Sequence, residues 1–553
     1  MNYVPEKLGG EDGLDSEAHA APSSPSSHPA TGPRSIWLWA MLLLPAVTAW
    51  VFVAHTHQVW EDFYITFRHT ENLVKGNGLV YEPGQRVHGF TSVLNTLVPA
   101  VPLMIFGTVD ASLFVYRLCS LVVLLAGLAM LGRDLVGRLH AGWAELLFGA
   151  LLVASSVKII FFTMNGQEVG FLVGFFALVL GAALRFEKPG AWRTMGLGWA
   201  GLLYTRPDTP LYIALVAAIA WSVYRGTNRG FTIGILRAGT LAAVCYGPWF
   251  IFAWAYYGTP VPHTVLAKAA DSLLVGGSSL ATFSAIGEKF VFIAGEIFGP
   301  IYGLGSWPEW LGWGAVLGGG LTAVVWVLPA PDRFTRSCSF VLFLILFYQC
   351  WLRVQREAYP WYFGPATLLA IVVAGRIAAM MWSRRVWWMR GTAVVLCGGL
   401  LAVSTVIFAL SHTQVRIQQT EVEENTRKAI GLWLAENAAP GDSVYLEPIG
   451  YIGYYSQLKI LDFPGLVSPE VVKARREHKA GFYELPAILK PKWIVARSNE
   501  ITGFQTIQAV ARSYEVAKIF DRKKEVARYG LYPGYHTAQY DSWFVVLRRK
   551  AGK

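Results

Sequence analysis

The sequence predicts a polytopic α-helical membrane protein, with about 11 transmembrane helices followed by a small C-terminal α/β domain. Hydrophobic residues make up 54% of the 553 residues and charged residues only 15%, whereas soluble proteins average about 25% charged residues. Apolar runs recur from residue 36 to about residue 410, and strand and helix patterns replace them afterwards. This composition excludes a disordered, collagenous or disulfide-framework protein. The net charge of +11 fits topology-setting loops better than a nucleic-acid partner.

The first 34 residues are rich in Ser, Pro, Ala and Gly, which predicts a disordered tail. The first apolar run begins at Ile36, and no small-residue cleavage site follows it. We therefore interpret this run as a retained transmembrane helix and not as a signal peptide.

A transmembrane domain is predicted over residues 35–410. Several of its apolar runs are shorter than the roughly 20 residues that cross a bilayer. One further run, 91–107, contains Pro99 and Pro102 and is predicted to lie on the outer surface without crossing. The predicted spans are 36–54, 112–131, 142–161, 168–185, 194–205, 209–224, 237–257, 309–329, 338–353, 361–382 and 391–410.

The orientation follows from five short basic loops, which together hold 13 Lys and Arg against three Asp and Glu. Cytoplasmic loops are enriched in Lys and Arg, so all five are placed inside. The N-terminus is then cytoplasmic, and the first external loop (55–111) and the C-terminal domain are outside. The basic loops are 133–138, 185–193, 225–237, 332–336 and 384–390.

The predicted C-terminal domain covers residues 411–553 and is placed in the periplasm. Its helical and strand patterns alternate, which is typical of an α/β unit. Helices are predicted at 421–437, 469–478 and 483–489, and strands at 443–448, 459–463, 492–496 and 542–549.

Two adjacent carboxylates, Glu61 and Asp62, follow the first span. A carboxylate near a low-dielectric surrounding has a raised pKa and can accept a proton from an attacking hydroxyl. The alternative is that both are ordinary charges at a helix end. No cluster has metal-ligand spacing, so no cofactor is predicted, although oxygen ligands at this pair leave a divalent cation open.

Cationic and polar residues recur in the segments predicted to lie outside. Cations at this face can hold a phosphate, or they can contact anionic lipid headgroups. Charges at membrane depth are costly unless they are paired or functional. The candidate substrate-binding residues are Arg68, Arg86 and His88 in the first loop, Glu168 in NGQE, Arg206 and Asp208 in TRPD, His263 and Lys268 in the loop after residue 257, and Arg353 and Arg356 at an outer helix end.

The stretch EDFYITFRHTENLVKGNGLVYEPGQRVHGFTS (61–92) resembles the first external loop of bacterial GT-C glycosyltransferases, and it is most similar to AftB-like arabinofuranosyltransferases. The segments NGQE (165–168), LLYTRPDTPLY (202–212) and PWFIFAWAYYGTPVPHTVLAKA (248–269) resemble further loop motifs of that family. The segment 442–469 resembles the opening of its soluble outer domain.

The resemblance implies transfer of a sugar, arabinofuranose first, from a polyprenyl-phosphate donor to a glycan or glycoprotein acceptor outside a bacterial cytoplasmic membrane. It also implies that Asp62 is the base, with Glu61 as its neighbour. The chain departs from the family pattern at Glu61, where Asp is usual, at His88, where Glu is usual, and at His263, where Asn is usual. These departures concern the identity of the sugar more than the reaction class.

Other function classes remain open on the residues alone. A transporter or flippase of lipid-linked sugars would explain the spans and the cations, but it predicts inverted repeats or paired broken helices, and only one broken pair is found. A mannose-type polyprenyl-phosphate transferase would share the chemistry. A scaffold that binds glycan would leave the charged outer loops without a role.

Overall fold

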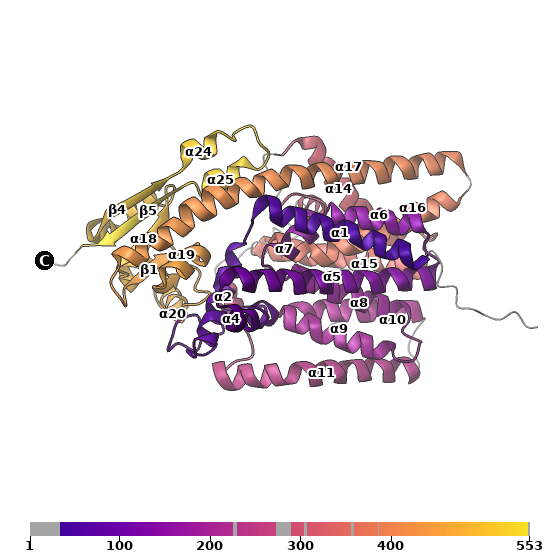
Figure 1. Ribbon diagram of the computed structural model, residues 1–553, viewed down its shortest axis with the longest axis horizontal. Coiled ribbons are helices and arrows are strands. Elements are labelled where there is room, and N and C mark those ends of the chain that lie inside the picture. Colours follow the sequence, from indigo (N-terminus) through magenta and orange to yellow (C-terminus); the bar gives the residue numbers. More distant parts are fainter. Residues whose placement is uncertain are drawn as a thin grey trace, which may run out of the picture.

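The computed structural model describes residues 34–224, 229–272, 289–302, 307–355, 359–384 and 386–550. A helical bundle forms one part of the molecule, and an α/β domain lies at one end of it (Figure 1). The predicted tail, 1–34, lies outside the described residues except for Arg34, where the first helix begins. The structure therefore confirms the predicted class, a multi-helix apolar bundle with a small C-terminal α/β unit.

Each predicted span corresponds to a helix of the bundle. By length and composition, six helices of the described chain can cross a membrane, or up to eight if each bent pair is one span. The predicted total of eleven crossings therefore stays a prediction. The helices are α1 (Arg34–Thr56), α5 (Val109–Leu139), α6 (Trp143–Ala154), α8 (Val169–Leu184), α9 (Ala191–Thr205), α10 (Thr209–Tyr224), α11 (Arg229–Tyr257), α14 (Glu309–Val324), α15 (Arg333–Gln355), α16 (Gly364–Ser383) and α17 (Trp387–Ile417).

Four of the five predicted basic loops are largely helical in their described residues, since α15 begins at Arg333 and α17 at Trp387. Residues 133–138 belong to the last turns of α5, and α11 already begins at Arg229, inside the predicted loop 225–237. These helices continue beyond their apolar runs, because a helix that leaves the hydrocarbon can carry Lys and Arg in its polar end turns.

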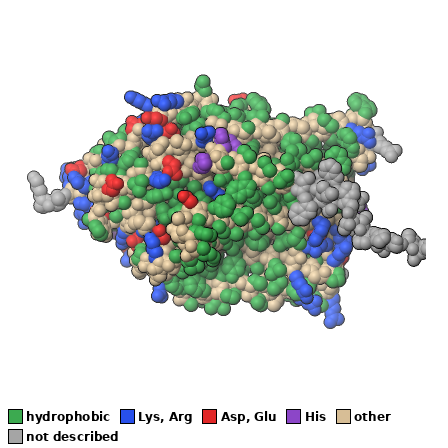
Figure 2. Space-filling view, viewed as in Figure 1, with side chains coloured by type: hydrophobic (Ala, Val, Ile, Leu, Met, Phe, Trp, Pro, Cys, Tyr) green, Lys and Arg blue, Asp and Glu red, His purple; other side chains and the backbone are tan. Residues whose placement is uncertain are grey.

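The basic segments meet at one end of the bundle. Arg185 pairs with Asp134 at 2.9 Å, and Arg376 of α16 pairs with Asp332 at 3.2 Å. Figure 1 shows this end opposite the C-terminal domain. Figure 2 shows a mainly hydrophobic surface between the charged ends of the molecule. This distribution matches the charge asymmetry from which the sequence predicts the orientation.

The predicted first external loop (55–111) folds back over the bundle. The chain bends by 89° after α1 and enters α2 (Glu61–Val74). The run 91–107 forms two short helices, α3 (Val93–Leu97) and α4 (Ala100–Phe106), interrupted near Pro99. Figure 1 shows α4 beside α2, at the end of the bundle that meets the C-terminal domain.

Short segments complete the bundle. After α6, the chain bends by 60° into a π-helix, η1 (Val157–Phe161), and α7 (Phe162–Met164). NGQE forms the short turn between α7 and α8, and TRPD lies at the short turn between α9 and α10. The remaining elements are α12 (His263–Ser272), the 3-10 helix η2 (Val325–Val327) and the 3-10 helix η3 (Pro360–Phe363).

The C-terminal domain is built on a five-stranded sheet of order β2-β1-β3-β5-β4. Strands β2, β1 and β3 are parallel, whereas β5 is antiparallel to β3 and β4. The four predicted strands are present, and β4 is additional. The strands are β1 (Ser443–Leu446), β2 (Lys459–Asp462), β3 (Trp493–Arg497), β4 (Tyr514–Asp521) and β5 (Trp543–Arg549).

Helices cover both faces of this sheet. Val444 of β1 packs with Ile430 and Ile449 on one face, whereas its neighbour Tyr445 packs with Val471 on the other, as the two-residue period of a strand requires. The helices are α18 (Ala429–Asn437), α19 (Ile449–Ser456), α20 (Pro469–His478), α21 (Leu485–Leu489), α22 (Ile501–Thr506), α23 (Gln508–Ser513), α24 (Lys523–Ala527) and α25 (Tyr535–Tyr540).

The bundle and the domain share a helix. Helix α17 continues through a π-helix, η4 (Gln418–Lys428), into α18, and the three form one helical segment of 51 residues. The predicted domain boundary between residues 410 and 411 therefore falls inside a continuous helical segment.

Candidate active site

Asp62 is held at the start of α2 by the turn that contains NGQE. The Trp60 amide donates to the Asn165 carbonyl at 2.7 Å, and Gln167 Nε2 donates to Asp62 Oδ2 at 3.0 Å. Burial raises the pKa of Asp62, while the Gln167 hydrogen bond and the positive charges of Lys268 and Arg206 oppose the shift. A carboxylate with a raised pKa is a stronger base, so this geometry suits the role that the sequence predicts for Asp62.

NGQE and TRPD meet in one cluster through Glu168 and Arg206, which lie 38 residues apart in the sequence. Arg206 donates from Nη1 to Glu168 at 2.5 Å and from Nε to Asp208 at 2.8 Å. Its guanidinium lies 4.4 Å from the centre of the Tyr362 ring. Asn95 Nδ2 also donates to Glu168, at 3.3 Å. The structure thus brings together three of the predicted substrate-binding residues, but it pairs their charges with one another.

Lys268 of α12 provides a second cation at this site. Its ammonium lies 5.0 Å from the centre of the Tyr359 ring, and its charge lowers the pKa of Asp62. Within the described ranges Lys268 makes no ion pair. Its charge is therefore available to an anionic group beside Asp62.

Glu61 points toward the C-terminal domain. Its Oε2 pairs with Arg427 Nη1 at 2.7 Å, and its Oε1 accepts from the Gly450 amide at 3.0 Å. Burial and the nearby Glu423 carboxylate raise the pKa of Glu61, and the guanidinium opposes this rise. Both oxygens are occupied, so we describe Glu61 as a contact between α2 and the domain.

The described residues contain no group of three or more His, Cys, Asp and Glu side chains arranged to hold a metal ion. At the Glu61–Asp62 pair, one of the two carboxylates already has protein partners on both oxygens. That the chain needs no cofactor stays a prediction.

The Arg68 guanidinium binds a carboxylate and two backbone carbonyls of the protein. The side chain is 2% exposed and pairs with Glu82 at 2.9 Å. It also donates to the Gly453 and Leu458 carbonyls at 2.8 and 3.1 Å. A buried guanidinium with these three partners ties the predicted first external loop to the C-terminal domain, and its place among the substrate cations stays a prediction.

Arg86 and His88 lie elsewhere on this loop. Arg86 is exposed and lies 4.9 Å from the centre of the Tyr256 ring. His88 is buried and stacks on Tyr257 with ring centres 4.7 Å apart, and both of its ring nitrogens lack a hydrogen-bond partner among the described residues. Burial lowers the pKa of His88 to about 4, so a neutral imidazole packs here at neutral pH.

The remaining predicted residues lie at the rim or beyond the described residues. The His263 amide donates to the His88 carbonyl at 2.8 Å, and its side chain lines a depression with Lys473 and Arg476 of α20. Arg353 lies in the last turn of α15, but its side chain lies outside the described residues, as does Arg356 altogether.

Two site residues were missed by the sequence reasoning. Gln167 lies inside NGQE, and the presence of a side-chain amide between two apolar runs is the feature of the sequence that could have indicated it. Arg427 is 366 residues from Glu61, and no local pattern links a helical Arg in a polar segment to a carboxylate so far away.

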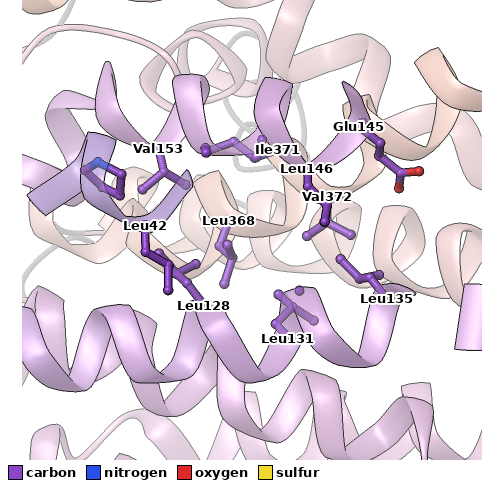
Figure 3. A pocket seen from close by; sticks show the side chains of 15 residues that line it. Leu42, Leu128, Leu131, Leu135, Glu145, Leu146, Val153, Leu368, Ile371 and Val372 are labelled. Atoms are coloured by element: carbon purple, nitrogen blue, oxygen red, sulfur yellow. The ribbon is translucent and has the colours of Figure 1, made fainter. Parts of the chain in front are cut away.

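An apolar cavity of about 90 Å³ lies in the bundle between α1, α5, α6 and α16. Figure 3 shows leucine, isoleucine and valine side chains around it, with Glu145 at one end. Glu145 pairs with Arg376 at 3.2 Å. None of the predicted site residues lines this cavity, so it is separate from the candidate active site.

Comparisons with known proteins show what this chain is similar to. A protein family described as a domain of unknown function (DUF8728) matches residues 413–544. The chain is similar to the terminal beta-(1->2)-arabinofuranosyltransferase of Mycobacterium tuberculosis, at 28% identity over 38% of this chain and 35% of that protein. It is similar to the protein of that name from Corynebacterium glutamicum, at 26% identity over 49% of this chain and 42% of that protein. The chain thus spans less than half the length of these curated relatives.

Two solved structures have a fold similar to that of this chain. ArnT from Cupriavidus metallidurans, solved bound to undecaprenyl phosphate, aligns with a TM-score of 0.53 and 15% identity over 94% of this chain and 99% of that one. The oligosaccharyltransferase of Archaeoglobus fulgidus, solved in complex with Zn and sulfate, aligns with a TM-score of 0.52 and 11% identity over 88% of this chain and 72% of that one. The chain therefore has the GT-C fold and is similar to the arabinofuranosyltransferases, as its loop motifs predict.

Proposed function

We propose that the chain is a membrane glycosyltransferase that moves a sugar, arabinofuranose by its resemblance, from a polyprenyl-phosphate donor to a glycan or glycoprotein acceptor. The observation that carries the proposal is the placement of Asp62. Its carboxylate is held by Gln167 between the bundle and the C-terminal domain, and it feels the charges of Lys268 and Arg206. A base beside cations is what transfer from a phosphate-linked sugar requires.

In the proposed reaction, Asp62 accepts the proton of the acceptor hydroxyl. The hydroxyl oxygen attacks the anomeric carbon while the bond from that carbon to the donor phosphate oxygen breaks. Polyprenyl phosphate leaves with the electron pair. A single displacement of this kind inverts the configuration at the anomeric carbon.

Lys268 and Arg206 are the described cations that would stabilise the leaving phosphate. Neutralising its negative charge makes it a better leaving group. The Arg206 guanidinium already pairs with Glu168 and Asp208, so the phosphate would have to share it with these two carboxylates. Lys268 is therefore expected to contribute more to stabilising the phosphate. Glu168 and Asp208 would accept hydrogen bonds from sugar hydroxyls.

The proposed orientation places the active site and the C-terminal domain on the outer side of a bacterial cytoplasmic membrane, with the N-terminus inside. Lys and Arg at the opposite end of the bundle support this orientation. The domain would cover the site and meet the acceptor, which arrives from that side.

The test is a transfer assay with the purified protein in lipid. A panel of polyprenyl-phosphate sugars, arabinofuranose and mannose first, is supplied with and without glycan acceptors, and release of polyprenyl phosphate is measured. We expect release from one donor and its loss in Asp62→Asn. The matched control is Asp110→Asn, an exposed residue at the start of α5, which should retain wild-type turnover.

Two results would redirect the proposal. Wild-type turnover in Asp62→Asn would remove Asp62 as the base. Movement of intact donor across vesicles without any cleavage would favour a transporter, the class that the spans and cations alone also allow.

A further inference from the structure

The C-terminal domain contacts the carboxylate next to the proposed base. Glu61 uses one oxygen to accept from the Gly450 amide at 3.0 Å and the other to pair with Arg427 at 2.7 Å. Helix α19 approaches so closely that a Cβ on Gly450 would lie 2.2 Å from the Glu61 backbone oxygen. Glycine is therefore required at residue 450 for α2 to occupy its position.

The orientation of Arg427 is fixed within the domain. Its Nη1 also bonds to Glu423, one helical turn away, at 2.9 Å, and its Nη2 bonds to Asp541 at 2.7 Å. The side chain of Arg427 is 6% exposed. A buried guanidinium with two carboxylates of its own domain has little freedom, so it presents Nη1 to Glu61 in a defined place.

Further contacts hold the residues that precede α2. Tyr451 donates its hydroxyl to the Val59 carbonyl at 3.1 Å, and Gln419 accepts from the Val59 amide at 3.1 Å. On its other side, the start of α2 is fixed to the bundle through Trp60 and Asp62. The start of α2 is therefore clamped between the bundle and the domain, and the clamp includes both acidic residues.

We propose that Glu61 is a positioning residue, through which Arg427 and Gly450 of the C-terminal domain place Asp62 for catalysis. This inference rests on the proposed function, and it goes further by giving the domain a part in the catalytic geometry. Asp62 follows Glu61 on the same rigid helix, so a shift of one moves the other. A misplacement of about 1 Å can cost about 100-fold in rate.

Three variants disturb this one contact in different ways. Glu61→Gln turns an amide toward the guanidinium, Arg427→Gln removes the guanidinium, and Gly450→Ala inserts a methyl group without changing any charge. Each is expected to lower kcat by about 10- to 100-fold and to leave the donor KM within about twofold. Arg427→Lys, which keeps the charge, should recover part of the loss.

The matched control is Gly399→Ala in α17, where no heavy atom lies within 4 Å of the added methyl group. It should retain wild-type kcat. The double variant Glu61→Gln/Gly450→Ala should be no slower than the slower single variant, because both changes break the same contact. Losses that multiply would overturn the proposal, and so would a raised donor KM with unchanged kcat in Glu61→Gln.

Hydrogen exchange separates this proposal from the proposed function, because it needs no turnover. Amides of residues 59–67 should exchange faster in Glu61→Gln and Gly450→Ala than in the wild type or Gly399→Ala, while those of α8 stay unchanged. Failure of the wild type to transfer any sugar would refute the function but leave this result interpretable. Unchanged exchange at 59–67 in both variants would overturn the positioning role.

Discussion

Gln167→Leu tests the environment of the proposed base without touching the base itself. Leucine is close to glutamine in size but lacks the amide that donates to Asp62 at 3.0 Å. Gln167 is 2% exposed, so water does not easily replace the lost donor. The variant should leave the Asp62 carboxylate buried and less stabilised.

The expected size of the effect follows from this one bond. A hydrogen bond to a charged group contributes about 1.5 to 3 kcal/mol, and 1.36 kcal/mol corresponds to one pH unit in a pKa. The Gln167 bond favours the ionised form of Asp62, so its loss raises the pKa of Asp62 further. Since Asp62 must be ionised to accept a proton, the fall of activity toward acid moves to higher pH by about one to two pH units.

The assay is the pH profile of kcat/KM for transfer from the donor that the transfer assay identifies. The acid limb should move to higher pH in Gln167→Leu. The rate on the alkaline plateau should fall by a smaller factor than the rate on the acid limb. Gln505→Leu, a change at an exposed residue of α22, should not move the limb. An unchanged acid limb in Gln167→Leu, with the variant folded, would refute the assignment of that limb to Asp62.

Three more predictions concern single side chains. Lys268→Met should raise the donor KM by about 10- to 100-fold, the value of a hydrogen bond to a charged group, and Lys268→Arg should largely restore it in the same titration. Arg68→Met leaves Glu82 without its partner and should lower the thermal unfolding midpoint, in line with about 3 to 5 kcal/mol for one half of a buried pair. His88 stays neutral in the folded protein down to its pKa of about 4 but takes up a proton near pH 6.5 when unfolded. The His88 imidazole should thus cost the wild type up to about 3 kcal/mol of stability between pH 6.5 and 4. His88→Phe, which keeps the stacking on Tyr257, should lose less stability than the wild type in melts across that range, and the loss that remains includes that of the buried His69, whose pKa burial lowers to about 3.

The elements that the sequence predicts are those with a strong repeating pattern. Apolar length identified the helices of the bundle, and the alternation of buried residues identified strands such as β1. Strand β4 was missed because it lies at the sheet edge with most of its side chains exposed, so it shows no apolar alternation. Helix α19, with the sequence IGYIGYYS, was missed because glycine disfavours helix; contacts with α2 and the sheet hold it.

The site was predictable only in part, because a sequence displays charges without their distant partners. Arg206 and Asp208 lie two residues apart, so their pairing could be predicted from the sequence. The sequence offers Arg68 as a substrate cation and gives no sign of its backbone partners, which lie 385 and 390 residues away in the C-terminal domain. Glu61 was grouped with the base for the same reason, since Arg427 gave no local signal.

The charges of the described site do not yet balance for an anionic donor. Three carboxylates, Asp62, Glu168 and Asp208, face two cations, Arg206 and Lys268, which leaves an excess of one negative charge when all are ionised. A polyprenyl-phosphate sugar adds another negative charge in the same low-dielectric surroundings, where unlike charges must be paired closely. The site therefore needs further positive charge before it can bind its donor.

The sequence offers that charge at Arg353 and Arg356, near the end of α15. Basic residues at an outer helix end run against the usual charge bias, which an anionic partner would explain. If these residues complete the site, Arg353→Gln and Arg356→Gln should each raise the donor KM, and EDTA should leave transfer unchanged. Loss of transfer in EDTA, restored by a divalent cation, with both variants binding donor normally, would instead place the missing charge on a metal ion.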